Sequence, residues 1–440
     1  MELRLPYDLA RRQVCVEIPD EKVAGVVKPG RAKTLNPETV KRLVRENPYL
    51  RRLIGEVKKR RGRLSILVDD HTRPTPVKDI LPVLLDMAGD EVDVRILYAK
   101  GTHDIPPRWL LERKLGRDVL NDTRLIMHDA YKFEDHIFKG VTRYGTPVWI
   151  NREAAEADAM IGIGSIFPSE VAGFTGGCKI VLPGIAFWSS INKNHMLFIS
   201  PSVGVGRLEG NVLRMDIDEA GLIAGLDAVV DFVMGVDDGI LGVFIGKPVE
   251  THRRGVKLCE KLYKTSVAEK AKVVLVSPGG TEDLDLVQAF KAVFTADRVC
   301  EDGGVIVLVA ACPLGTQWSE LEEFMETVRV KKLDRADILR MVVDSRVEAL
   351  AGGFVYRLYH ILVEGRKKLY LVSDNISWKT AETLGFKPFR DVQEAVDEAI
   401  EETKGRVLAI PYAAYNWVEK PPGGYFLTAT TSSVLLRAQP

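Results

Sequence analysis

The sequence lacks an excess of charge of either sign. Among its 440 residues, Lys plus Arg and Asp plus Glu number 61 each, so the formal net charge is zero. A chain without an overall positive field does not attract nucleic acid or an anionic membrane surface over long distances. We therefore expect neither as a partner, and any anionic ligand must be held by local basic residues.

Paired cysteines and long apolar runs are missing as well. The 5 cysteines are scattered and never form a C-x-x-C pair, which argues against a disulfide framework or a structural zinc site and suits a reducing compartment. No stretch approaches the roughly 18 uninterrupted apolar residues of a membrane-spanning helix, and the N-terminal MELRLPYDLARR has no apolar signal core. We expect a cytoplasmic protein.

Short apolar runs alternate with helix-like stretches along the chain. Strands are expected at 64–70, 93–100, 159–166, 226–236, 272–276, 304–311, 369–373 and 406–410, and helices at 77–87, 249–269, 286–298, 318–329 and 391–403. This alternation predicts an α/β fold with mostly parallel sheets, whose ligand-binding groups gather at the carboxyl ends of the strands. We expect two domains, 1–269 and 270–407, with the active site in the cleft between them and the tail 408–440 packing back on the first domain.

Two polar loops directly follow predicted strands. In DDHTRPTP, two prolines stiffen the turn that presents Asp70, Thr72 and Arg73. An Arg held in this way can grip a carboxylate or phosphate through two parallel hydrogen bonds. In KGTHD, His103 lies near the end of the sheet, where an imidazole can act as a general acid or base. Each motif taken alone is also compatible with a structural turn.

The glycine-rich segment 162–184, GIGSIFPSEVAGFTGGCKIVLPG, is the most informative. Gly176 and Gly177 belong to a loop that can bring backbone N–H groups close to an anion. Lys179 at its end can clamp an anion or, if desolvated, act as a nucleophile. The loop lacks the spacing of a P-loop, and the G-x-G-x-x-G dinucleotide fingerprint is absent. A tight backbone crossing is the alternative interpretation.

Two further motifs supply candidate ligands. His195, in NKNHM, is a plausible metal ligand without a second His at a metal-binding spacing, so it suits a metal held largely by a cofactor. Gln288 and Lys291, in SPGGTEDLDLVQAFK, lie on one face of a predicted helix near its start and can point into a cleft. A solvated helix surface explains the second motif equally well.

Taken in order, these motifs resemble those of the lactate racemase family that uses a nickel-pincer nucleotide. The resemblance rests on DDHTRPTP, GTH, P-x-x-x-AGFTGGCK…PG, NH and SPGG…QAFK, and it covers most of the chain. It implies a cofactor derived from nicotinic acid adenine dinucleotide, the pyridinium-3-thioamide-5-thiocarboxylic acid mononucleotide nickel pincer, which separate maturation proteins supply. Because sulfur and carbon donors of the cofactor hold the nickel, the protein needs to add one imidazole.

The resemblance also implies an activity and a role for each residue. The activity is racemisation or epimerisation of a small 2-hydroxy acid by proton-coupled hydride transfer. Lys179 would form a thioamide tether to the cofactor, and His195 would bind nickel. The remaining roles are substrate-carboxylate binding by Arg73 and Lys291 with Gln288 nearby, acid/base catalysis by His103, and contact with the cofactor by Asp70, Thr72, Gly176 and Gly177.

The sequence departs from the family pattern at two positions. Pro168-Ser169 stands where members usually have Pro-His, and Val287 stands where they often have Tyr. Ser169 cannot act as a general base near neutral pH without help. The candidates to replace the second acid/base group are therefore Glu170 and His71. These changes predict a substrate other than simple lactate, such as a larger or polyhydroxylated 2-hydroxy acid.

Three alternative functions stay open at this point. A one-sided hydride-transfer oxidoreductase acting on a 2-hydroxy acid would explain the loss of one His. A nicotinamide-dependent dehydrogenase would need the dinucleotide fingerprint that this chain lacks. A catalytically inactive nucleotide-binding homologue would not need to retain all the polar residues of the motifs. The sequence does not determine the oligomeric state.

Overall fold

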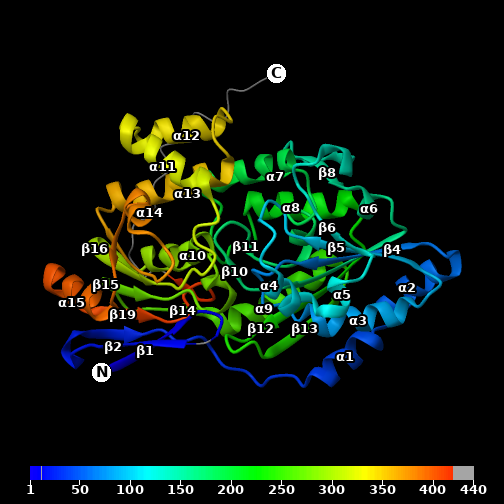
Figure 1. Cartoon of the computed structure of the whole chain (residues 1–440), viewed down its shortest axis with the longest axis horizontal. Coiled ribbons are helices and arrows are strands. Elements are labelled where there is room, and N and C mark those ends of the chain that lie inside the picture. The colour runs from blue at the N-terminus through cyan, green and yellow to red at the C-terminus, as the bar shows by residue number, and fades with distance from the viewer. Residues whose placement is uncertain (11, 420–440) are drawn as a thin grey trace.

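Two six-stranded sheets form the centre of the protein in the computed structural model, which describes residues 1–10 and 12–419 (Figure 1). The first sheet has the order β13-β12-β9-β4-β5-β6, and its neighbouring strands are parallel except for β12 and β13. The strands are β4 (Arg63–Asp69), β5 (Asp93–Ala99), β6 (Leu125–Met127), β9 (Ala159–Ser165), β12 (Ala228–Met234) and β13 (Ile240–Gly246). The predicted α/β class with mostly parallel sheets is confirmed.

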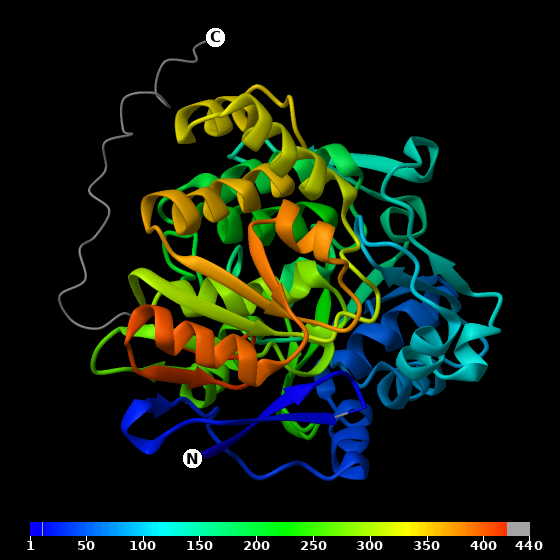
Figure 2. The ribbon, with the colours of Figure 1, turned by 60° about the vertical axis from the view of Figure 1, so that its left-hand side comes forward.

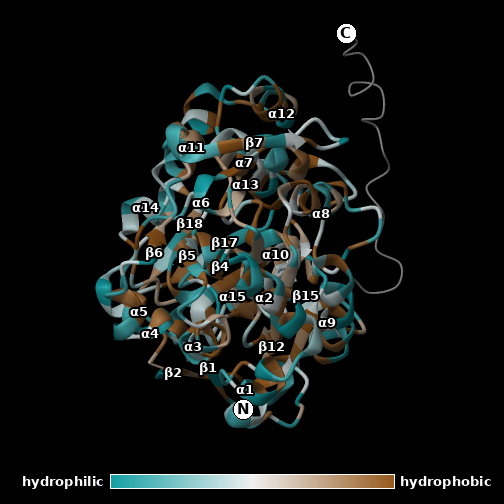
Figure 3. Cartoon of the chain, turned by 90° about the vertical axis from the view of Figure 1, so that its right-hand side faces the viewer, coloured by the Kyte–Doolittle hydropathy of each residue, from teal (hydrophilic) through white to brown (hydrophobic). Residues whose placement is uncertain are grey.

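Strand β4 illustrates how the sequence builds a helical layer on each face of this sheet. Successive side chains of a strand point to opposite faces. Ile66 and Val68 pack with the helices on one face, and Leu67 packs with those on the other. The first face is covered by α1 (Pro37–Arg45), α2 (Pro48–Arg60) and α3 (Val77–Ala88), and the second by α8 (Val212–Ala224). Helices at the periphery carry both hydrophilic and hydrophobic residues (Figure 3), as expected where one face is buried.

The second sheet is parallel throughout and has the order β18-β17-β16-β15-β19-β3. One face packs against α10 (Leu286–Asp297) and the other against α15 (Val392–Thr403). The hairpin of β1 (Glu2–Tyr7) and β2 (Arg12–Glu17) joins the layer of α15, below that helix in Figure 2. The strands are β3 (Val23–Val26), β15 (Ala271–Val276), β16 (Cys300–Val309), β17 (Lys368–Val372), β18 (Phe386–Phe389) and β19 (Val407–Ile410).

The sheets divide the chain differently from the predicted domains 1–269 and 270–407. Strand β3 is the edge of the second sheet, and the hairpin before it packs on that sheet, so the chain begins in the second unit. Strand β3 is only 4 residues long and covers the backbone of β19, a contact that local sequence patterns cannot reveal.

The tail predicted from residue 408 onward also divides. Its first residues belong to β19 in the second sheet, whereas Ala414 and Tyr415 join a cluster with Ile166 and Phe167 of the first unit. Strand β20 (Trp417–Glu419) then pairs with β14 (Lys264–Ser266). The remainder of the predicted tail, 420–440, lies outside the described residues.

The stretch of chain that connects β16 to β17 forms a helical layer, which reaches across to the first unit (Figure 1). It contains α11 (Ser319–Lys331), α12 (Arg335–Val343) and α13 (Ala349–Tyr359), and α13 packs on α7 (Trp188–His195). Helix α9 (Pro248–Tyr263) ends earlier than predicted because the following residues form β14. Within the described residues, no helix combines the length and apolarity needed to cross a membrane.

The remaining elements are short or peripheral. They are η1 (Asp20–Lys22), α4 (Arg108–Leu115), α5 (Arg117–Leu120), η2 (Phe133–Asp135), β7 (His136–Val141), β8 (Pro147–Asn151), α6 (Arg152–Ala155), β10 (Pro168–Ser169), β11 (Gly173–Phe174), η3 (Gly177–Ile180), η4 (Met196–Ile199), η5 (Gly280–Asp283), the π-helix η6 (His360–Glu364) and α14 (Trp378–Thr383).

Candidate active site

A cavity of about 140 Å³ lies between the two sheets, where the polar loops after β4, β5 and β9 meet the start of α10. This position follows the rule that parallel sheets bind ligands at the carboxyl ends of their strands. Eleven of the twelve site residues predicted from the sequence line it: Asp70, Arg73, His103, Ser169, Glu170, Gly176, Gly177, Lys179, His195, Gln288 and Lys291. Thr72 is not among the lining residues.

His103, half-buried at the edge of the cavity, contacts the buried carboxylate of Asp70. The Nδ1 atom of His103 lies 2.5 Å from Oδ2 of Asp70. Oδ1 of Asp70 accepts hydrogen bonds from the amide and the hydroxyl of Thr72, at 3.1 and 2.6 Å. Burial alone raises the pKa of Asp70, but the charge and hydrogen bond of His103 outweigh it and bring the pKa well below its usual value. An ionised Asp70 therefore fixes the Nδ1–H tautomer and leaves Nε2 of His103 free to accept a proton.

Thr72 thus lies behind Asp70 and holds its carboxylate, and its predicted contact with the cofactor stays a prediction. A second buried pair, which the sequence did not indicate, anchors the same loop. Nζ of Lys114 on α4 lies 2.6 Å from Oδ1 of Asp69 and donates to the Arg73 carbonyl at 2.9 Å. The loop is therefore rigid at both ends, which keeps the Arg73 side chain in place.

The glycine loop around Gly176 and Gly177 is shaped by a buried arginine. Gly177 has a φ of 62°, and a Cβ there would lie 2.7 Å from Nη2 of Arg214. Arg214 donates to the carbonyls of Phe174 and Gly176, both at 3.2 Å. The Gly177 amide donates to Oδ2 of Asp231 at 2.9 Å, so a protein carboxylate already uses that N–H group.

The side chain of Lys179, at the end of this loop, is half-buried and makes no hydrogen bond or ion pair with another described residue. Burial lowers the pKa of its ammonium group to about 7, and the positive charges of Arg73, Lys291 and Arg214 act in the same direction. A large fraction of Lys179 is consequently a neutral, nucleophilic amine at neutral pH.

His195 is the last residue of α7 and faces the same cavity. Its Nδ1 lies 2.7 Å from the carbonyl of Ile191, so Nδ1 carries the proton and Nε2 offers a lone pair. Burial lowers the pKa of His195 to about 4, and the charge of Lys179 adds to this effect. No cluster of three or more His, Cys, Asp or Glu residues suited to a metal ion occurs in the described chain.

Arg73 lies in the loop after β4 of the first sheet, and Lys291 lies on α10, which packs on the second sheet. Their side chains meet at a buried carboxylate, that of Glu282. Nη1 of Arg73 lies 3.3 Å from Oε1 of Glu282, and Nζ of Lys291 donates to Oε2. Lys291 also donates to Oε1 of Gln288 at 2.6 Å. Both cations lie over the ring of Phe167, with 5.5 and 5.7 Å to its centre. Sequence reasoning missed Glu282, because nothing local distinguishes it from an exposed glutamate at the start of a helix.

Ser169 stands at the position of the second His of the family pattern, and Glu170 follows it. Oγ of Ser169 accepts a hydrogen bond from the Ala172 amide at 3.3 Å, which makes it part of the β10–β11 turn. Oε2 of Glu170 pairs with Arg357 of α13 at 3.2 Å, while its buried Oε1 has no hydrogen-bond partner among the described residues. Glu170 therefore has one uncommitted carboxylate oxygen in the wall of the cavity.

His71, the other candidate replacement, does not line the cavity. Its Nδ1 lies 3.1 Å from the hydroxyl of Tyr98, and burial lowers its pKa to about 4. It is consequently a neutral, internally bonded histidine within the loop.

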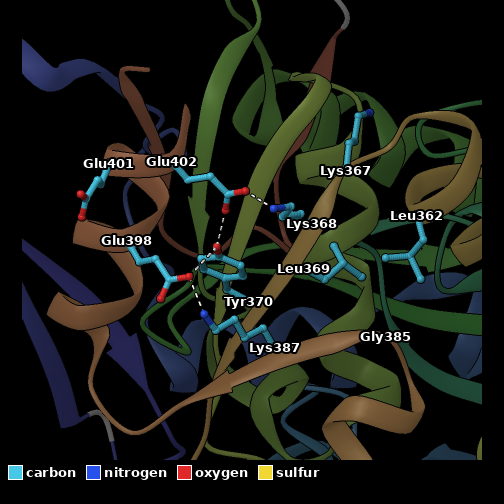
Figure 4. Close-up of a pocket in the computed structure, with 10 residues that line it drawn as sticks. All are labelled: Leu362, Lys367, Lys368, Leu369, Tyr370, Gly385, Lys387, Glu398, Glu401 and Glu402. Atoms are coloured by element: carbon cyan, nitrogen blue, oxygen red, sulfur yellow. Dashed lines mark hydrogen bonds and ion pairs between the residues drawn. The ribbon is translucent and has the colours of Figure 1, made fainter. Parts of the chain in front are cut away.

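A more open groove of about 540 Å³ on the far side of the second sheet shares no residue with this cavity (Figure 4). Most of its charged groups neutralise one another. Lys387 lies 2.5 Å from Glu398, Lys368 pairs with Glu402, and Tyr370 donates to Glu402 at 2.7 Å. The groove is therefore a solvated network of ion pairs, which makes it a poor candidate for catalysis.

Comparison with known protein families agrees with this arrangement. Residues 9–206 match the lactate racemase N-terminal domain, and residues 266–413 match the lactate racemase C-terminal domain. The lactate racemase of Thermoanaerobacterium thermosaccharolyticum is 28% identical over 422 residues, which is 93% of this chain and 97% of that protein. The lactate racemase of Lactiplantibacillus plantarum is 31% identical over 315 residues, or 70% of this chain and 74% of that protein.

Solved structures show the same similarity in three dimensions. The apoprotein of the T. thermosaccharolyticum lactate racemase superposes with a TM-score of 0.83 at 26% identity, covering 96% of this chain and 100% of that one. A Thermotoga maritima protein with a TM-score of 0.67 at 17% identity, covering 90% and 100%, shares the fold. Since both domain models match in order, and one lactate racemase matches over nearly its full length, the chain belongs to the lactate racemase family.

Proposed function

We propose that this protein is a racemase or epimerase of a 2-hydroxy acid other than lactate, and that it works with a nickel-pincer nucleotide. One observation carries the proposal. Lys179 with its pKa lowered to about 7, a His195 with a free Nε2 and the His103–Asp70 pair all line a single cavity, together with two carboxylate-binding cations. Membership of the lactate racemase family supports isomerase activity.

The residues present fit the proposed cofactor. Lys179 has the neutral amine that a thioamide tether requires, and no ion pair with a described residue competes for it. His195 would supply the single protein ligand to nickel, because the Ile191 carbonyl fixes its tautomer with Nε2 unprotonated. The absence of a protein metal cage among the described residues agrees with a metal that arrives already held by soft donors.

In the proposed reaction, Arg73 and Lys291 hold the substrate carboxylate and thereby orient C2. When bound, the nickel-pincer nucleotide supplies the acceptor and donor of the C2 hydride. Nε2 of His103 takes the proton of the 2-hydroxyl, and Asp70 stabilises the imidazolium that results. For the opposite enantiomer, the free Oε1 of Glu170 exchanges the proton, with Arg357 holding the other oxygen in place.

One-sided oxidation of a 2-hydroxy acid is the second candidate. It is favoured by the turn that occupies Ser169 and by the ion pair of Glu170, since neither residue reproduces an imidazole. The two functions differ in their products, because a racemase returns a 2-hydroxy acid whereas an oxidoreductase accumulates a 2-keto acid.

The test uses holoenzyme produced together with nickel-pincer maturation proteins, which are the proposed partners in the cytoplasm along with the substrate itself. Single enantiomers of a 2-hydroxy-acid panel are incubated and analysed by chiral chromatography and by 2-keto-acid determination. We expect loss of optical purity, a C2-deuterium isotope effect, bound nickel and a mass adduct on Lys179. A nickel-loaded enzyme that leaves every enantiomer unchanged would show the proposal to be wrong, and stoichiometric keto acid would favour the one-sided reaction.

A further inference from the structure

Arg73 and Lys291, the two cations that would bind the substrate carboxylate, are here called the carboxylate clamp. The net charge of the clamp is lower than these two cations alone would give. Arg73 and Lys291 both contact the carboxylate of Glu282, whose side chain is fully buried. Because the Glu282 side chain is fully buried, its charge is screened weakly and acts strongly on the two cations in contact with it. Two positive charges and one negative charge leave a net single positive charge for the ligand. The other lysines that line the cavity are Lys100, which follows β5, and Lys179, which lies in η3.

One face of α10 continues from the clamp into an apolar wall. Val287, Lys291 and Phe294 follow one another at helical spacings of four and three residues, so they share a face, and all three line the cavity. From α13, Leu350 and Phe354 line the cavity next to them, and the rings of Phe294 and Phe354 lie 5.2 Å apart. A ligand whose carboxylate binds Lys291 would thus have the rest of its chain next to these apolar side chains.

The charged pair next to this wall contains a carboxylate. Glu170 lines the cavity, and Arg357, its partner, lies over the ring of Phe294 at 5.3 Å. A second carboxylate on the ligand would meet Glu170 rather than a free cation. A hydroxyl-bearing chain would lose its water along Val287, Phe294, Leu350 and Phe354 without gaining hydrogen bonds from these side chains.

From these contacts we infer that the substrate is a monocarboxylic 2-hydroxy acid with an apolar side chain larger than methyl, and that Glu282 restricts the site to monocarboxylates. This inference rests on the proposed function and narrows its substrate class. Of the two options that the sequence suggested, a larger acid fits this wall and a polyhydroxylated acid does not. Glu282 acts through Arg73 and Lys291, so it is a positioning residue.

The test compares binding and conversion separately on the holoenzyme. The panel contains lactate, 2-hydroxyisocaproate, 3-phenyllactate, malate and gluconate. Binding is measured by calorimetry, and conversion by chiral chromatography. We expect 2-hydroxyisocaproate or 3-phenyllactate to exceed lactate by about 10-fold or more in kcat/KM, the size of effect that an extra methylene produces in an apolar pocket.

Two variants test the two halves of the inference. Glu282→Gln removes the negative charge that partly neutralises Arg73 and Lys291. Malate binding should therefore tighten about 10-fold relative to 2-hydroxyisocaproate binding. Leu350→Asn should remove most of the preference for 2-hydroxyisocaproate over lactate, measured as the ratio of the two kcat/KM values. The matched control is Asp297→Asn, which removes a partly buried carboxylate at the other end of α10, 2.6 Å from Lys367, and should leave the order of the panel unchanged.

The outcomes separate the inference from the proposed function. Wild-type enzyme that binds malate or gluconate as tightly as the apolar acids would overturn the inference, even if it racemises them. Preferential binding of the apolar acids without any conversion would support the substrate class and contradict the racemase. The wild-type panel and Leu350→Asn decide the matter should Glu282→Gln not fold.

Discussion

Replacing Asp70 by Asn keeps the shape of the site and reverses one hydrogen bond. Asp70 accepts from two donors of Thr72 through one oxygen and faces Nδ1 of His103, 2.5 Å away, with the other. An Asn side chain has one acceptor end and one donor end. Because Thr72 presents two donors, the amide oxygen faces Thr72 and the amide NH2 faces His103. His103 must then hold its proton on Nε2, where it cannot accept the proton of the substrate hydroxyl.

The expected loss follows from the contribution of an oriented acid/base group. Such a group accelerates reactions by about 10²- to 10⁴-fold, and a wrong tautomer removes most of that gain. We expect kcat of Asp70→Asn to fall by about 10²- to 10³-fold, or about 3–4 kcal/mol of transition-state stabilisation. KM should change little, because Arg73 and Lys291 bind the carboxylate independently of Asp70.

The assay is steady-state racemisation of the best panel acid by holoenzyme, with nickel content measured for each variant. Thr72→Val is the matched control, because it removes one donor from Asp70 and leaves the carboxylate facing His103. Its kcat should fall much less than that of Asp70→Asn. An Asp70→Asn holoenzyme with a kcat within about 10-fold of wild type would refute the tautomer argument.

Three further predictions concern the loop and the second acid/base group. In the apoprotein, the reactivity of Lys179 toward an amine-acylating reagent, followed by mass spectrometry, should rise with a midpoint near pH 7 and level off above it, since burial lowers its pKa to about 7. A rise continuing to pH 10 would contradict this. Gly177→Ala should destabilise the protein by about 1–3 kcal/mol in urea unfolding, because φ is 62° and Arg214 blocks the Cβ, whereas Gly55→Ala, inside α2 with nothing within 4 Å, should stabilise it by about 0.5–1 kcal/mol. Glu170→Gln should reduce racemisation by about 10²-fold and Ser169→Ala should leave it near wild type; the reverse order would assign the proton transfer to the serine.

Much of the fold could be predicted because buried parallel strands are continuous apolar runs. β9 and β12 are buried at every residue, and both were predicted within two residues of their ends. The β1–β2 hairpin, β3 and the antiparallel β13 were missed. These strands are short or alternate between more buried and more exposed residues. Their place in a sheet depends on partners far away in the sequence, such as β19 for β3.

The residues of the candidate site also fall into two groups, those that the sequence predicts and those that it does not. Residues presented by short motifs at strand ends, such as His103 and Lys179, could be found from the sequence because strand direction alone brings them together. Residues that support them could not. Lys114, Arg214 and Glu282 act from helices or turns whose positions depend on tertiary packing, and each resembles an ordinary charged residue in its local sequence.

Strand β3 has a consequence for motion between the two units. Since the chain starts in the second sheet, leaves it after β3 and returns at β15, two connections join the units rather than one. These connections touch, because the Gly30 amide donates to the Leu262 carbonyl at 2.7 Å. A paired connection of this kind resists twisting and permits bending about a single axis. We therefore expect any opening of the cavity between the two units to bend the chain near Gly30 and Leu262 and to separate α13 from α7.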